Sequence, residues 1–126
     1  MRLEVQGESL ASQVQFASLL AQKATDMAVR SFEVDGKTEV KLAPDGRPVH
    51  RTSLQGMRVQ DGVPVSPDRS VSLSLIEPVD VLPGRFYTVS GKTWVTHYVD
   101  NSERIAVSVV AERVRPVQAP VEPKQA

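Results

Sequence analysis

Short stretches in which apolar and polar residues alternate, separated by turn-forming dipeptides, fill most of the chain after residue 30. Asp35-Gly36 and Asp61-Gly62 are pairs favoured in the tight turns of β-hairpins, and residues 70–76 show the two-residue period of a half-buried strand. Residues 105–111 are apolar on both faces, as in a central strand, whereas residues 64–67, bounded by two prolines, favour a loop. The pattern predicts a mainly β protein, a small barrel of about five or six antiparallel strands.

The segment before these strands has a different composition, rich in Ala, Leu and Gln. Its apolar residues recur at steps of three and four, the spacing of one helical face: Leu10, Val14, Ala17, Ala21, Ala24 and Ala28. We therefore expect one N-terminal helix over about residues 9–29, with a strand through Val14-Gln15-Phe16 as the competing interpretation.

The length of 126 residues predicts a single domain, and the absence of cysteine excludes disulfides, thiolate metal sites and cysteine nucleophiles. No apolar run is long enough to cross a membrane, and the N-terminus lacks the pattern of a signal peptide. We expect a cytoplasmic protein with no membrane partner. The domain is expected to span residues 1–115, followed by a disordered, proline-rich tail over 116–126.

Residues with catalytic potential are sparse. The two histidines, His50 and His97, have no metal-ligand spacing, and neither a nucleophile elbow nor a glycine-rich phosphate loop is present. The carboxylates are scattered, mostly in turns, where aspartate is favoured for backbone reasons. The sequence predicts a protein that is not an enzyme, with no catalytic residues, no metal, no cofactor and no small-molecule substrate.

Aromatic residues are concentrated in residues 83–100, which contain the single Trp and both Tyr. If this segment is a strand, one face carries Tyr87, Val89, Val95 and Val99, which we expect to face the core, and the other carries Phe86, Lys92, Trp94, Thr96 and Tyr98. Gly91 marks a bend or bulge. The second face mixes aromatics with a cation, as surfaces for unpaired bases do, but a helix, a dimer partner or a ligand would each cover it.

Basic residues are spread through the predicted strands and turns: Arg47, Arg51, Arg58, Arg69, Arg85, Lys92, Arg104 and Arg113. Arginine offers planar stacking and bidentate contact with phosphate, although ordinary solvated charges beside acids explain the same pattern. Because the net charge is zero, the sequence argues against a strongly electrostatic binder of duplex DNA.

Several of these residues stand in an order that resembles the small single-stranded-DNA-binding proteins of filamentous phages. The matching stretches, within about residues 44–116, are Gly46-Arg47-Pro48, Ser53-Leu54, residues 71–75, residues 83–89, Trp94 and residues 107–116. A looser similarity exists to replication or excision activators of actinobacterial integrative elements. The first resemblance implies an OB-like barrel, commonly a dimer, that coats unpaired DNA without sequence preference. It assigns Trp94 to base contact and Arg47 to a basic turn beside the DNA-binding strand.

The resulting hypothesis is non-catalytic, sequence-independent binding of single-stranded DNA during replication of a phage, plasmid or mobile element. The expected nucleic-acid-binding residues are Arg47, Arg51, Arg58, Arg85, Phe86, Lys92, Trp94 and Tyr98. We expect the cations to follow the phosphates and the aromatics to stack on bases, in a homo-oligomer, specifically a dimer. The alternatives are a protein-interaction or regulatory module of a replication complex, and a structural oligomer.

Overall fold

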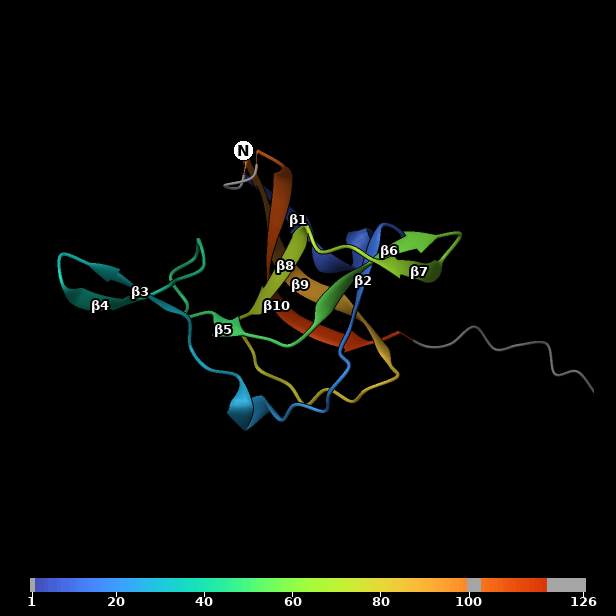
Figure 1. The fold of residues 1–126 in the computed structure, drawn as a ribbon, viewed down its shortest axis with the longest axis horizontal. Coiled ribbons are helices and arrows are strands. Elements are labelled where there is room, and N and C mark those ends of the chain that lie inside the picture. Colours follow the sequence, from blue (N-terminus) through green and yellow to red (C-terminus); the bar gives the residue numbers. More distant parts are fainter. Residues whose placement is uncertain (1, 100–102, 118–126) are drawn as a thin grey trace, which may run out of the picture.

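A computed structural model describes residues 2–99 and 103–117, and the description below is confined to them. The strands are β1 (Arg2–Gln6), β2 (Val14–Ala17), β3 (Ser31–Val34), β4 (Lys37–Val40), β5 (His50–Arg51), β6 (Gln55–Gln60), β7 (Val63–Pro67), β8 (Val71–Leu75), β9 (Phe86–Val99) and β10 (Ile105–Pro116). Two single turns of 3-10 helix, η1 (Gly7–Leu10) and η2 (Ala24–Asp26), complete the elements (Figure 1). The mainly β class is therefore confirmed.

One sheet contains most strands, in the order β5-β8-β10-β9-β2-β6-β7, with β1 also paired to β9. β3 and β4 form a separate hairpin that projects from the body (Figure 1). Strands β8 and β10 run parallel, while the other pairs are antiparallel. The predicted small antiparallel barrel was thus wrong in two respects: the hydrogen-bonded path is open, and one central pair is parallel.

The predicted helix over residues 9–29 is also wrong. The described segment contains η1, β2 and η2, and the competing interpretation of Val14-Gln15-Phe16 as a strand is confirmed. A helix presenting the predicted face would bury mainly alanine methyl groups and leave Phe16 outside it. As part of β2, Phe16 is fully buried and pairs with Tyr87 on one side and Gly56 on the other. The burial of one large aromatic outweighs the helical preference of several alanines.

Both predicted Asp-Gly turns are present, with positive φ at Asp35, Gly36, Asp61 and Gly62. The proline-flanked segment expected to be a loop is instead β7, which pairs with β6 alone and forms the end of the sheet. An edge strand tolerates proline because its missing N–H faces away from the sheet. The predicted central strand is confirmed as β10, which lies between β8 and β9.

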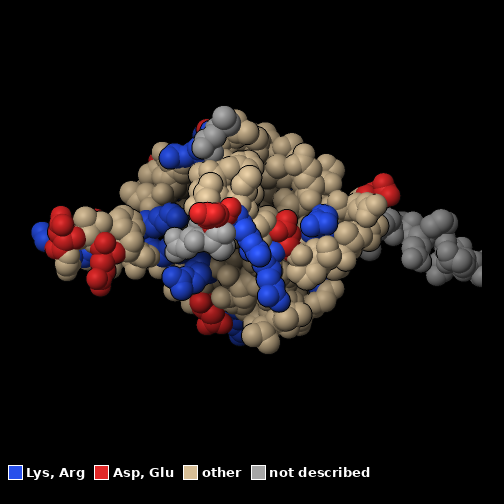
Figure 2. All heavy atoms as spheres, turned by 45° about the horizontal axis from the view of Figure 1, so that its top comes forward, with Lys and Arg blue, Asp and Glu red and all other residues tan. Residues whose placement is uncertain are grey.

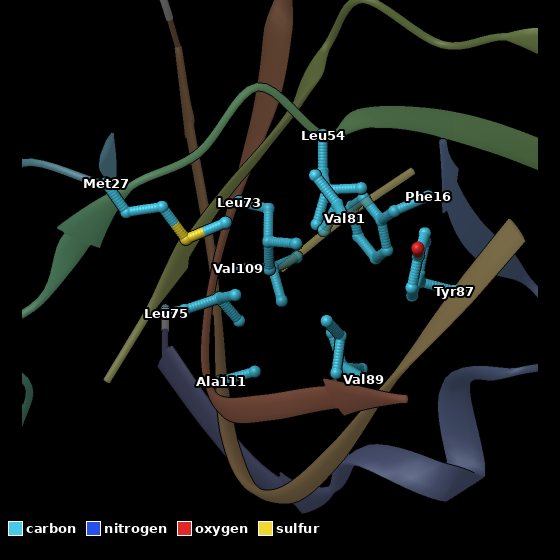
Figure 3. Close-up of a cluster of buried hydrophobic side chains, with 11 residues drawn as sticks. Phe16, Met27, Leu54, Leu73, Leu75, Val81, Tyr87, Val89, Val109 and Ala111 are labelled. Atoms are coloured by element: carbon cyan, nitrogen blue, oxygen red, sulfur yellow. The ribbon is translucent and has the colours of Figure 1, made fainter. Parts of the chain in front are cut away.

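The main hydrophobic core lies where the curled sheet encloses its own inner face. Side chains from β2, β8, β9 and β10 converge there with Met27, Leu54 and Val81 from the connecting segments (Figure 3). Leu73, Leu75, Tyr87, Val89 and Val109 are all nearly or fully buried. The inward positions predicted at Tyr87 and Val89 are therefore confirmed. Those predicted at Val95 and Val99 were wrong, since Val95 is half-buried and Val99 is 68% exposed.

Gly91 interrupts β9, as predicted, with a φ of +81° and a register irregularity opposite it between Ala111 and Arg113. Beyond this bend the outer face of β9 carries a second, smaller buried cluster, in which Trp94 packs with Ala43, Val49 and Ile76. The expectation that a helix, a partner or a ligand covers Trp94 is corrected here, because residues of the same chain between β4 and β5 cover it.

No helix in residues 2–99 and 103–117 is long and apolar enough to cross a membrane. Pro116 ends β10, and the backbone N–H of Val117 donates to the carbonyl of Phe86 at 2.8 Å. The remainder of the predicted tail, residues 118–126, lies outside the described residues. The predicted domain boundary at residue 115 stays a prediction.

Candidate functional site

The eight residues expected to bind nucleic acid do not form one site. Arg47 and Lys92 lie near the bend of β9, where Asp45 and Glu112 are also located. Arg85 and Phe86 line a separate apolar cavity. Arg58 is exposed on β6, on the opposite side of that strand from Met57.

Arg47 is engaged with two carboxylates. Its Nε donates to Asp45 Oδ2 at 2.8 Å, and its Nη2 donates to Glu112 Oε2 at 2.9 Å. The hydrogen bond from Arg47 lowers the pKa of Asp45. The hydrogen bond from the backbone N–H of Lys92 lowers the pKa of Glu112, and the hydrogen bond from Arg47 lowers it further. This cluster binds the segment between β4 and β5 to the bend of the sheet, and it leaves Arg47 few free donors for a phosphate.

Trp94 and Tyr98 lie on the same side of β9 but differ in exposure. Trp94 is 4% exposed, so its ring offers no free stacking surface, whereas Tyr98 is 46% exposed. Both line one cavity, of about 400 Å³, on the outer face of β1, β8, β9 and β10. Of these two predicted stacking residues, Tyr98 is therefore the accessible one.

The floor of this cavity is a row of polar side chains across four strands. Arg2 of β1 pairs with Thr96 of β9, Thr96 with Ser108 of β10, and Ser108 with Ser72 of β8. Residues directly paired across a sheet share a face, so the guanidinium and the three hydroxyl groups stand side by side. Hydroxyls both donate and accept hydrogen bonds, which suits them to phosphate and sugar oxygens.

Two further cations border the cavity at the root of the projecting hairpin, Arg30 before β3 and Lys41 after β4. The backbone N–H of Lys41 donates to the carbonyl of Arg30 at 2.8 Å, and Arg30 Nη1 donates to Ser74 Oγ at 2.8 Å. Burial, together with the nearby charge of Arg30, lowers the pKa of Lys41. A lowered pKa caused partly by a like charge marks a place where a bound anion would relieve repulsion.

A second cavity continues the first along β8. It shares Arg30 and Ser72 with the first cavity and adds Arg51 and Arg69. We call the two cavities together the basic groove. Its cations are Arg2, Arg30, Lys41, Arg51 and Arg69, and no described Asp or Glu lines it.

Charge is thus segregated on a chain whose net charge is zero. Figure 2 shows Lys and Arg side chains gathered where the hairpin meets the body, while acidic side chains stand along the hairpin itself. Within the described part of the chain, none of the five groove cations belongs to a salt bridge. The groove therefore holds a local excess of positive charge that composition alone does not reveal.

Sequence reasoning missed Arg2, Arg30 and Lys41, which lie in a short N-terminal strand and at the two ends of the hairpin. The polar side of residues 70–76 was a usable signal, because Ser72 belongs to the hydroxyl row. Arg51, one of the residues expected to bind nucleic acid, lines the groove.

No cluster of three or more potential metal ligands occurs among the residues that the structure describes. No family model, curated protein or solved structure matches the chain.

Proposed function

We propose that the protein binds single-stranded DNA without catalysis and without sequence preference, along the basic groove. The observation that carries the proposal is a pair of adjoining cavities with five cations that form no salt bridge within the described residues, no described acid in the lining, a floor of hydroxyls and an exposed aromatic ring. A groove that combines positive charge with a stacking surface is the usual composition of single-strand binding sites.

In this mode the groove cations contact successive phosphates, and one base stacks on Tyr98. Stacking on an aromatic residue contributes about 1–3 kcal/mol per base. Since no set of base-edge donors and acceptors is needed, the contacts discriminate little between sequences. The hydroxyl row adds hydrogen bonds to the backbone and not to the bases.

The strand connections support an OB-like arrangement for the five strands β2, β6, β8, β9 and β10. β2 pairs with β6 and β9, and β10 pairs with β9 and, in parallel, with β8. A closed barrel would also need β6 to lie beside β8. These two strands approach each other closely, because a Cβ atom added to Gly56 would lie 2.9 Å from Val71 Cβ. OB folds bind oligonucleotides over their second and third strands and the loops between strands one and two and between four and five.

In this arrangement the basic groove would overlap the expected binding region at β8 and at the two loops. Arg51 and Arg69 lie beside β8, while Arg30 and Lys41 belong to the long connection from β2 to β6. Tyr98 lies near the end of β9, before the connection to β10. Three further points also remain proposals: the resemblance to phage single-stranded-DNA-binding proteins, the role in replication and the cytoplasmic location.

Binding of a fluorescently labelled oligo-dT, measured by anisotropy at low salt, tests the proposal. We expect binding to oligo-dT and weaker binding to a duplex of the same length. Arg51→Glu should weaken it strongly, whereas Arg58→Glu, an exposed charge reversal outside the groove, is the matched control. Absence of oligo-dT binding, or equal effects of the two reversals, would contradict the proposal.

Two alternative functions are a protein-interaction module and a structural oligomer. Both would depend on a different feature, the exposed hairpin β3–β4. The strands of the hairpin do not themselves line the basic groove.

A further inference from the structure

The projecting hairpin lacks the packing that a two-stranded sheet needs. Within the described residues, strands β3 and β4 pair only with each other, and all their residues are exposed. An isolated two-stranded hairpin is marginally stable in water, and packing against another element is what stabilises it. The favourable Asp35-Gly36 turn sets its register but buries no apolar surface.

The hairpin surface is both apolar and acidic. Phe32 and Val34 share one face and are 49% and 44% exposed, and Val40, on the other face, is 47% exposed. Its acids are Glu33, Asp35 and Glu39, against the single cation Lys37.

The body carries a surface of complementary character, away from the hairpin. A cavity of about 500 Å³ is lined by Leu19, Leu20, Met57 and Phe86. Its lining also includes Arg69 and Arg85 and no described acid. Leu19 is 96% and Leu20 71% exposed. We call this cavity the apolar groove. Its two arginines form no salt bridge within the described residues.

The hairpin does not reach the apolar groove of its own chain. Figure 1 shows it projecting away from β2, β6 and β7, on the side opposite to the strands that carry the groove. Its root is also fixed, because the backbone N–H of Arg30 donates to the carbonyl of Val49 at 2.9 Å.

We propose that the hairpin of one copy docks in the apolar groove of a second copy. Phe32 and Val34 would contact Leu19, Leu20 and Phe86. Glu39, which is paired with Phe32 and shares its face, would lie near Arg69 and Arg85. The two surfaces differ, so the contact is heterologous and each added copy leaves one hairpin and one groove free. Such a contact joins copies head to tail, which suits a protein that covers a long polymer.

Charge reversal on each side supplies the test, by sedimentation velocity without DNA. The hairpin variant is Glu33→Lys/Glu39→Lys, and the groove variant is Arg69→Glu/Arg85→Glu. All four residues are exposed, so circular dichroism should show both variants folded. We expect the sedimentation coefficient of the wild type to rise with concentration, that of each variant to stay at the monomer value, and an equimolar mixture of the two variants to associate again.

A wild type that stays monomeric at all concentrations would overturn the proposal, as would folded variants whose mixture fails to associate. A third variant, Phe32→Ser, tests the apolar part of the contact and should abolish the concentration dependence. If Phe32→Ser instead leaves self-association intact and weakens oligo-dT binding, the hairpin contacts DNA and the proposed contact between copies is wrong. Because the sedimentation measurements contain no DNA, their outcome is independent of whether the basic groove binds nucleic acid.

Discussion

The outer face of β9 and β10 is covered by other residues of the chain at one end and open at the other. At one end the segment between β4 and β5 packs over Trp94, and the Arg47 guanidinium is held by Asp45 and Glu112. At the other end Tyr98 and the hydroxyl row stay uncovered, beside cations without carboxylate partners in the described chain. The same residue types therefore stabilise the fold where they are covered and paired, and form a candidate binding surface where they are not.

The largest expected effect concerns the covered end. Trp94→Ala removes a side chain that is 4% exposed, so it should lower the free energy of unfolding by about 3–5 kcal/mol. Urea denaturation measures this, with Tyr98→Ala as the control that should change stability little. A loss in Trp94→Ala no greater than in Tyr98→Ala would show that the ring is not packed as described.

Removing charge at the open end should affect binding more than folding. Arg30→Ala/Lys41→Ala deletes two charge-assisted contacts, each contributing roughly 1.5 kcal/mol, so oligo-dT affinity should fall on the order of 100-fold. Anisotropy at low salt measures it. Lys92→Ala, an exposed cation outside the groove, should leave the affinity nearly unchanged, and equal losses in the two variants would contradict the assignment of the groove.

Tyr98 provides a smaller test at the same end. Tyr98→Ala should weaken oligo-dT binding by about 1–3 kcal/mol, whereas Tyr98→Phe should retain most of the affinity because the stacking ring remains. The same anisotropy titration measures both variants. Equal losses would indicate that the hydroxyl and not the ring makes the contact.

The smallest effect is the pH dependence of the paired cluster. Arg47 lowers the pKa of Asp45, and the backbone N–H of Lys92 followed by Arg47 lowers that of Glu112, so these contacts stabilise the fold at neutral pH. That contribution is lost as the pH falls below about 4 and the carboxyls become protonated. Arg47→Gln should therefore lower Tm modestly at pH 7 and less at pH 3. A Tm difference that is the same at both pH values would contradict this role.

Local signals predicted much of the fold. The Asp-Gly turns, the bend at Gly91 and the central strand near 105–111 each follow from short-range backbone preferences or from apolar patterning. The helix over 9–29 failed because the decisive contacts of Phe16 are with Tyr87 and Gly56, far away in sequence. No local pattern contains that information.

The candidate site was less predictable for the same reason. Trp94 and Tyr98 are equivalent by strand alternation, and they differ because a segment from another part of the chain, containing Ala43 and Val49, covers the first of them. Arg2, Arg30 and Lys41 come together only when β1 and both ends of the hairpin meet at one sheet face. Charge counts along the sequence average these cations with acids that lie elsewhere in space.

The salt dependence of oligo-dT binding tests the central claim most directly. If the five groove cations contact phosphates, the slope of log affinity against log salt concentration should approach about −3.5, since each phosphate contact with a single strand contributes about −0.7. Arg30→Ala/Lys41→Ala should make the slope shallower by about 1.4. Binding that is independent of salt, or a slope that the double substitution leaves unchanged, would show that the basic groove does not bind the DNA backbone.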